Sequence, residues 1–293
     1  MKMLRALLVI TFIIQPLSAA IGTPSQSAME HKYGERLRHV FSFQAKIEPI
    51  HPIFKKVYPV AIVENKTFYV FEPVPERKVY RLVSTAPDTF NIPQGVRAAM
   101  PLGFWNNRSA CVVTGEIFDE SDGYIFIFHE FVHCAQWESC ERKLKGDLTV
   151  FQEAMKKKDY MWELQFPFPY EEKKFTERYA AFIKACDQND LAMVQSLRAE
   201  LKETLPAQAW EYMTWQEWKE GLARHLENRI RKAVGLPENT NGKNQPFNRV
   251  TFYHGGDRFI GFLERQQPGI IDDLEKLYRL ISPGDFRAAD VSW

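Results

Sequence analysis

One apolar stretch near the middle of the chain decides the predicted fold: Gly123-Tyr-Ile-Phe-Ile-Phe-His129-Glu130-Phe-Val-His133-Cys-Ala-Gln-Trp137. A helix turns once per 3.6 residues, so His129 and His133 stand on one face about one turn from each other. Apolar residues occupy both this face and the opposite one. They are Phe126 and Trp137 on the histidine side, and Phe128, Val132 and Ala135 on the other. We therefore expect this helix to lie in the interior.

The polar residues of this helix form a pattern with a chemical meaning. Two imidazoles on one helix face can share one metal ion, and the neighbouring Glu130 carboxylate can take a proton from water at that ion. This H-E-x-x-H pattern is typical of zinc sites in peptidases. Ionisable groups in a buried helix are costly unless they have partners. The stretch therefore predicts a zinc ion bound by His129 and His133, with Glu130 as the general base.

A catalytic zinc needs a third protein ligand, which must come from another part of the chain. Two glutamates in predicted helices compete for this role. Glu177 lies in Phe175-Thr-Glu-Arg-Tyr-Ala-Ala-Phe182, and Glu220 lies in Trp215-Gln-Glu-Trp-Lys-Glu-Gly-Leu-Ala-Arg-His225. The chemistry of zinc fixes the type of ligand but not the helix that supplies it, so residue type alone leaves both glutamates open.

Two motifs taken together resemble those of one known family. They are His129-Glu130-x-x-His133 and Trp-x-Glu220-Gly221-Leu-Ala223. This pair is similar to the gluzincin branch of the zincin-like metallopeptidases, over about residues 111–227. The resemblance implies that Glu220 is the third zinc ligand and that Gly221 and Ala223 let two helices approach closely. It also implies a zincin-like α+β fold with a cleft between two lobes.

The sequence departs from this family pattern after Glu220. His225 stands where members often have tyrosine, and Arg224 stands where thermolysin-like members usually have an aspartate. A metal-binding histidine needs support from an outer carboxylate, which must then come from elsewhere. Glu227, two turns beyond Glu220, is a candidate. The alternative interpretation is a solvated or ion-paired helix glutamate.

Peptide hydrolysis also needs a donor for the oxyanion that develops in the transition state. In the resembled family a tyrosine or histidine downstream of the third ligand has this role. The segment Thr251-Phe-Tyr-His-Gly-Gly256 lies in the corresponding part of the chain. We expect Tyr253 to be the donor, with His254 as the second choice. A packed tyrosine in a loop that enters a helix is the alternative.

The whole chain predicts an α+β protein with two lobes. A mixed-sheet lobe over residues 21–145 ends in the H-E-x-x-H helix, and residues 146–293 form a mostly helical lobe. The first lobe should begin with a helix over 27–43 whose buried stripe is Met29, Tyr33, Leu37 and Val40. We then expect a hairpin of 58–63 with 67–71 and a strand over 80–83. A loop over 86–108 with a helical piece at 95–100 should lead to a strand over 111–117. In the second lobe we expect helices near 148–160, 171–186, 190–204, 207–233, 256–265 and 270–281.

The strand before the H-E-x-x-H helix has a predicted role of its own. In a zincin it would be the edge strand above that helix, over Val112 to Ile117. An exposed edge can hold an extended peptide by strand addition. Glu116 on this strand would then reach the N-terminus of a bound peptide.

The N-terminal segment and the composition limit where the protein can be located and which partners it can have. Residues 1–20 combine a basic start, an apolar run and a small-residue exit at Ser18 and Ala20, which predicts a secretory signal peptide; an uncleaved anchor is the alternative. No second long apolar segment follows, so we expect the mature chain not to span a membrane. A net charge of +1 argues against nucleic acid as a partner. Four cysteines in an exported chain permit two disulfides.

These features predict an exported zinc peptidase that acts on a peptide or protein substrate. Two alternatives stay open. One is a non-catalytic binding or structural protein of the envelope that keeps the metal. The other is a metal-free secreted helical protein in which the H-E-x-x-H pattern occurs by chance.

Overall fold

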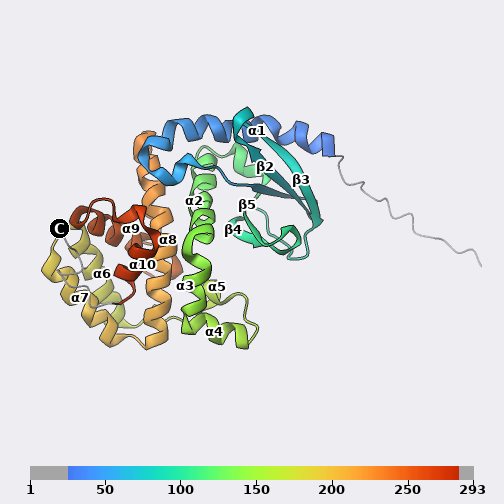
Figure 1. Ribbon diagram of the computed structural model, residues 1–293. Helices are drawn as coiled ribbons and strands as arrows, with labels where there is room; N and C mark the ends of the chain where they lie inside the picture. Colours follow the sequence, from blue (N-terminus) through green and yellow to red (C-terminus); the bar gives the residue numbers. More distant parts are fainter. Residues whose placement is uncertain (1–25, 284–293) are drawn as a thin grey trace, which may run out of the picture.

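The computed structural model describes residues 26–283 and has an α+β fold. The expected signal peptide, residues 1–20, lies outside the described residues. A five-stranded mixed sheet with a long helix along it forms one side of the molecule, and helices form the other (Figure 1). The prediction of an α+β fold, with a mixed sheet in the first part of the chain and helices in the second, is confirmed.

The sheet has the strand order β3-β2-β1-β5-β4. Its strands are β1 Val60–Glu64, β2 Thr67–Val74, β3 Val79–Pro87, β4 Arg97–Leu102 and β5 Arg108–Thr114. The predicted hairpin forms from β1 and β2, and Asn65 and Lys66 make its turn with left-handed backbone conformations. Strands β1 and β5 run parallel, whereas the other neighbouring pairs are antiparallel. The sheet is therefore mixed.

Two predictions about the sheet are wrong. Most of the segment 95–100, expected as a helical piece in a loop, belongs to β4, because pairing with β5 gives it a ladder that local propensity does not reveal. The strand expected over 111–117 is β5, which ends at Thr114 and is followed by the 3-10 turn Gly115–Asp119. Strand β5 lies between β1 and β4, so the edge strand on this side of the sheet is β4.

Two helices pack against the face of the sheet that points into the main core. Helix α1, Gln26–Ile47, buries the predicted apolar stripe against this face. Helix α2, Gly123–Gln136, is the H-E-x-x-H helix, and nearly all of its residues are buried, as predicted. It continues through one π-helical turn, Trp137–Glu141, into α3, Arg142–Asp147.

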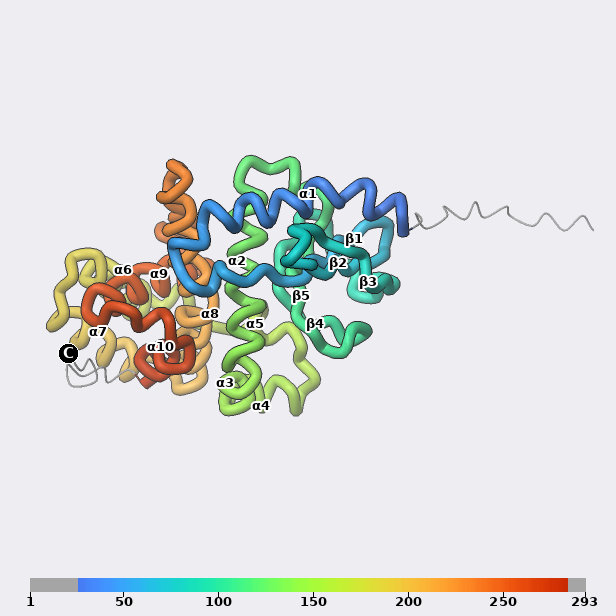
Figure 2. The backbone as a smooth tube through the Cα atoms, turned by 45° about the horizontal axis from the view of Figure 1, so that its top comes forward, coloured from blue at the N-terminus to red at the C-terminus, as the bar shows by residue number. Residues whose placement is uncertain are grey.

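Seven further helices follow α3 in the described part of the chain. They are α4 Thr149–Lys156, α5 Trp162–Gln165, α6 Lys173–Asp187, α7 Leu191–Thr204, α8 Ala207–Ala233, α9 Arg249–Gln266 and α10 Leu274–Ile281. Helices α6 to α10 lie on the side of α2 away from the sheet (Figure 1). The long helix α8 contacts both α2 and α9, and Figure 2 shows it between them. One apolar core runs from Met29 in α1 to Ile281 in α10. The two predicted lobes therefore share a single core.

Helix α9 begins earlier than predicted, at Arg249 rather than near residue 256. Asn248 caps it: its side chain accepts a hydrogen bond from Val250 N at 2.8 Å, and Asn248 N donates to Thr251 Oγ1 at 3.1 Å. The adjacent glycines at 255 and 256, which suggest a loop in the sequence, lie inside the helix. The early start places Tyr253 on a helix rather than on a loop.

All four cysteines are free thiols and all are buried, so the two permitted disulfides are absent. Burial raises the pKa of the Cys111 and Cys186 thiols well above their usual range, which keeps them protonated. Between residues 26 and 283, no helix has both the length and the apolar character needed to cross a bilayer.

Candidate metal centre

Three side chains from two helices converge at one point. His129 and His133 project from α2 and Glu220 from α8, and one ligand atom of each lies within 4.8 Å of the other two. Glu220 Oε2 is 3.3 Å from His133 Nε2 and 3.9 Å from His129 Nε2. Ligand atoms bonded at about 2.0–2.1 Å to a tetrahedral zinc are about 3.3–3.5 Å apart. This group could therefore hold a metal ion after a small contraction.

The other ring nitrogen of each histidine is already occupied. His129 Nδ1 lies 3.0 Å from Glu227 Oε2, and His133 Nδ1 lies 2.8 Å from Gln136 Oε1. Both partners are acceptors, so each Nδ1 carries the proton and each Nε2 keeps a lone pair for a cation. The Gln136 amide also donates to the carbonyl of Lys219 at 3.2 Å, which ties α2 to α8 next to the third ligand.

Glu227 is itself held by three donors, so it is an ionised outer support for His129. Arg231 Nε and Asn239 Nδ2 lie 2.8 and 2.9 Å from its Oε1, and Arg224 Nε lies 3.2 Å from its Oε2. Burial favours the protonated acid, but the bond to His129 and the nearby cations outweigh it and bring the pKa of Glu227 to about 2. Arg224 thus acts through Glu227.

The carboxylates around the histidines favour a positive charge at the centre. Burial alone would lower the pKa of His129, but Glu220 and Glu227 outweigh it and raise this pKa to about 10. Burial likewise opposes ionisation of Glu220, yet His133, His129 and Arg249 hold the pKa of its carboxyl well below the usual range. A cation bound here would take the place of a proton.

A close crossing of α8 and α9 sets the position of Glu220. A Cβ added to Gly221 would lie 2.5 Å from Gly256 Cα, and a Cβ added to Gly256 would lie 2.4 Å from Glu217 O. Real side chains do not tolerate such distances, so the two helices can approach this closely only because both positions are glycine. The close approach expected at Gly221 is therefore present.

A cavity of about 610 Å³ opens in front of the three ligands. Glu130 lines it, is only 7% exposed, and makes no hydrogen bond or ion pair with another residue in the described part of the chain. A buried carboxylate without a partner is costly and marks a group that a ligand or water completes. Edge strand β4 forms another wall of the cavity through Arg97, Ala98, Ala99 and Pro101.

Tyr253 lines the same cavity. Its phenol oxygen accepts a hydrogen bond from Nη1 of Arg249, one turn earlier on α9, and Arg249 Nη1 is also 3.7 Å from Glu220 Oε1. Burial and the negative charge of Glu220 hold the pKa of the Tyr253 phenol well above its usual range. The phenol therefore keeps its proton, and because its oxygen accepts from Arg249, its O–H can donate in another direction.

His254 does not reach the cavity. It is buried, and neither of its ring nitrogens has a hydrogen-bond partner among residues 26–283. Burial brings its pKa down to about 4, so it is neutral near pH 7. The structure therefore places Tyr253, and not His254, beside the three ligands.

Glu177, the competing third ligand, lies elsewhere. It is on α6 with a side chain that is 65% exposed, and Lys173 Nζ is 3.7 Å away. The prediction of Glu177 as a possible third ligand is wrong. Helical spacing identified a glutamate but could not show that its side chain faces solvent.

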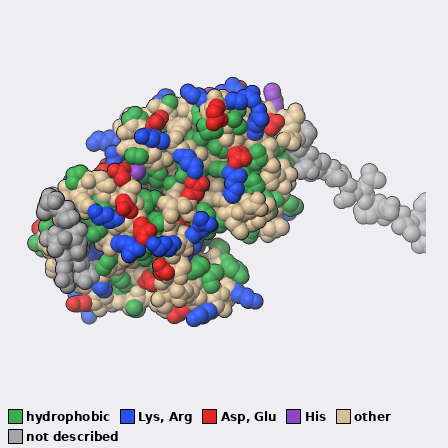
Figure 3. All heavy atoms as spheres, in the orientation of Figure 1, with side chains coloured by type: hydrophobic (Ala, Val, Ile, Leu, Met, Phe, Trp, Pro, Cys, Tyr) green, Lys and Arg blue, Asp and Glu red, His purple; other side chains and the backbone are tan. Residues whose placement is uncertain are grey.

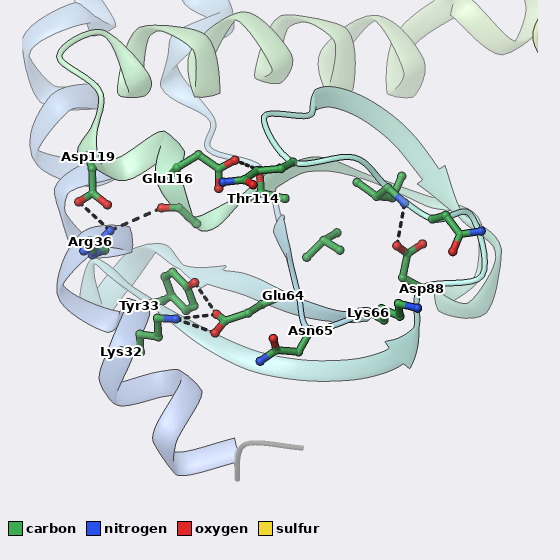
Figure 4. Close-up of a pocket in the computed structure, with 15 residues that line it drawn as sticks. Lys32, Tyr33, Arg36, Glu64, Asn65, Lys66, Asp88, Thr114, Glu116 and Asp119 are labelled. Carbon is green, nitrogen blue, oxygen red and sulfur yellow. Dashed lines mark hydrogen bonds and ion pairs between the residues drawn. The ribbon is translucent and has the colours of Figure 1, made fainter. Parts of the chain in front are cut away.

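The role expected of Glu116 is also wrong. Its Oε1 accepts hydrogen bonds from Gly95 N at 2.6 Å and Thr114 Oγ1 at 2.7 Å, in a separate cavity of about 650 Å³ beside α1. Figure 4 shows this cavity and the pairing of its charged residues. Lys32 pairs with Glu64 at 2.7 Å, and Arg36 pairs with Asp119 at 3.0 Å. No residue of the metal group lines it.

Sequence reasoning missed two residues of the centre, Gln136 and Arg249. Gln136 follows His133 by three residues on the same helix, a spacing that brings side chains together and could have identified it. Arg249 precedes Tyr253 by four residues, but this spacing has meaning only once α9 is known to begin at Arg249.

No family model matches the chain, and no curated protein or solved structure does either. The functional argument therefore rests on the geometry of the centre and its cavity.

Proposed function

We propose that the protein is an exported zinc-dependent peptidase. The observation that carries this proposal is the Glu130 carboxylate, which is buried, has no partner between residues 26 and 283, and lines the cavity onto which His129, His133 and Glu220 open. A structural metal site is closed by its ligands and needs no such free base. The position of Glu130 supports a reaction in which water is deprotonated.

In the proposed reaction each residue has one task. Bound zinc would supply Lewis acidity for the scissile carbonyl and for water. Glu130 accepts the proton of the attacking water and passes it to the leaving amine. Tyr253 donates its O–H to the developing oxyanion, and Arg249 holds the phenol in place. Glu227 and Gln136 orient the two histidines.

Edge strand β4 supports a peptide as the substrate. One side of β4 pairs with β5, and on its other side no strand from the described part of the chain pairs with it. Pro101 removes one N–H donor from this strand, which is tolerated at an edge. An extended peptide added along β4 would cross the cavity in front of the metal ligands.

The test is hydrolysis of a mixed peptide library by zinc-supplied protein. We expect wild type to cleave peptides and Glu130→Gln to lose about 10²–10⁴ in rate, the contribution of a general base. Glu177→Gln, altered at an exposed helix position, should retain the wild-type rate. Equal cleavage by Glu130→Gln would remove Glu130 as the base. No cleavage by zinc-loaded wild type would favour a non-catalytic binding protein.

A further inference from the structure

A segment after the H-E-x-x-H helix brings apolar side chains to the cavity of the metal centre. It comprises α4, α5 and the turn between them, and it follows α3 in the chain. We call its cavity-lining apolar residues the α4–α5 wall: Phe151, Met155, Tyr160, Trp162 and Leu164. The wall lies outside both motifs of the sequence, and the proposed reaction does not use it.

The exposure of this wall is unusual for the molecule. Among the described residues, nine large apolar side chains are exposed, and three of these lie between 160 and 164. Tyr160 is 75% exposed and Leu164 is 53% exposed. Scattered exposed apolar residues need no explanation, but a group at the mouth of a polar cavity marks a binding surface. Figure 3 shows a hollow between the sheet side of the molecule and this segment, with hydrophobic side chains on its lower rim.

The wall is fixed in place by α8, the helix that carries Glu220. Glu211 on α8 caps α4 by accepting hydrogen bonds from Thr149 N at 3.0 Å and Val150 N at 2.7 Å. Tyr212 OH donates to the carbonyl of Glu163 at 2.9 Å. Trp162 is buried and packs edge to face on Phe151, with ring centroids 6.0 Å apart. The wall is therefore preformed relative to the metal centre.

Two lysines and two glutamates beside the wall pair with one another. Lys219 Nζ lies 2.7 Å from Glu163 Oε2 and 3.0 Å from Glu141 Oε1, and Lys145 Nζ lies 3.6 Å from Glu163 Oε1. These four charges are therefore largely neutralised within the cavity. The opposite wall, on β4, presents the small side chains of Ala98 and Ala99 and leaves room between the two.

We propose that the α4–α5 wall is a specificity subsite that takes a large aliphatic or aromatic side chain of a peptide beside the bond to be cleaved. This inference rests on the proposed peptidase function. A peptide extended along β4 would point its side chains alternately to the two faces of the sheet, and the apolar surface of Tyr160 and Leu164 would cover one on the face toward the cavity. Covering part of such a side chain on this open wall contributes roughly 10-fold or more to discrimination.

The test compares peptides that differ at one position, with Leu, Phe, Ala or Asp there, by kcat/KM on the zinc-supplied full chain. We expect wild type to prefer Leu and Phe over Ala by about 10–100-fold and to disfavour Asp. In the double variant Tyr160→Ser/Leu164→Ser this preference should fall about tenfold or more. Phe90→Ser, which removes an equally exposed apolar residue outside the cavity, should keep the wild-type preference.

A binding measurement separates failure of the subsite from failure of the peptidase function. The same peptides, fluorescently labelled, are titrated into Glu130→Gln with and without the wall substitutions. Tighter binding of the Leu and Phe peptides that is lost in the wall variants supports the subsite even if wild type cleaves nothing. Binding or cleavage with the same preference in the presence and absence of the wall substitutions would overturn it, as would an absence of binding to Glu130→Gln.

Discussion

Two buried glutamates stand one turn apart on α8, and their surroundings differ in kind. Glu217 is fully buried, 2.7 Å from Arg198 Nη1, and accepts a hydrogen bond from Tyr179 OH at 2.9 Å. Glu220 lies beside two histidines at a cavity that Glu130 also lines, and Glu130 has no partner among the described residues. Glu217 belongs to a buried ion-paired cluster. Glu220 and Glu130 line a cavity, where their oxygens can still bind another group. Buried charge alone therefore does not mark a functional site; unused capacity that faces a cavity does.

The largest expected effect is the difference in stability between a variant of Glu217 and a variant of Glu130. Glu217→Gln should lower the free energy of unfolding by about 3–5 kcal/mol, because it leaves the buried guanidinium of Arg198 without a counter-charge. Glu130→Gln should leave it unchanged or raise it by up to about 1 kcal/mol, because it removes a buried charge that has no partner among residues 26–283. Urea unfolding of both variants beside wild type measures this. Equal losses would mean that Glu130 also belongs to a structural cluster.

A second experiment tests the outer support of the histidines. Glu227→Gln should weaken zinc binding by about 10–100-fold, because His129 loses the charged acceptor that orients it. Competition with a chelator gives the affinity. Gln136→Leu should weaken it in the same direction through His133, without leaving the buried Arg224 and Arg231 uncompensated. Unchanged affinity in both variants would contradict the assigned ring orientations.

The close contact between α8 and α9 near these two glutamates should give a smaller change in stability. Gly221→Ala should destabilise the protein by about 1–3 kcal/mol, because its methyl group would press on Gly256. Gly34→Ala, in α1 with open space around the new methyl group, should instead stabilise by about 0.5–1 kcal/mol. Thermal unfolding of the two variants should show opposite signs. A stabilising Gly221→Ala would show that α8 and α9 are not in contact there.

The smallest effect concerns a third charged group on α8. His225 Nδ1 lies 3.0 Å from Asp257 Oδ1 and its Nε2 lies 3.1 Å from Glu264 Oε2. Burial lowers the pKa of His225, but the two carboxylates outweigh it and raise this pKa. A raised folded-state pKa stabilises fully below the unfolded value of about 6.5, and this contribution is lost as the pH rises through the folded value.

Wild type should therefore exceed His225→Gln in unfolding free energy by about 1 kcal/mol at pH 6, and by less at pH 9. Urea unfolding at the two pH values measures the difference. A difference that grows towards alkaline pH would show that the imidazole is held neutral.

The residues whose position depends on one helix were predictable from the sequence. The spacing of His129, Glu130 and His133 needs only the helical repeat, and the stripe of α1 follows the same rule. The pairing of Glu220 with them came from a motif resemblance and not from a physical rule, because no local pattern states which of two distant helices approaches α2. The choice between Glu177 and Glu220 therefore needed the structure.

Features that depend on pairing between distant segments could not be predicted. The segment 97–102 becomes a strand because β5 offers it an edge, although its own sequence contains a proline and reads as a loop. Tyr253 and Arg249 share a helix because Asn248 caps it and because Gly255 and Gly256 fit against neighbouring side chains and α8. In isolation those glycines read as loop signals.

The most direct test of the central claim is zinc content per chain, by elemental analysis, for wild type, His133→Ala, Glu220→Ala and Glu177→Ala. We predict close to one zinc per chain in wild type and in Glu177→Ala, and loss of zinc in the other two. Retention of zinc in Glu220→Ala, or absence of zinc from wild type supplied with the metal, would contradict the site.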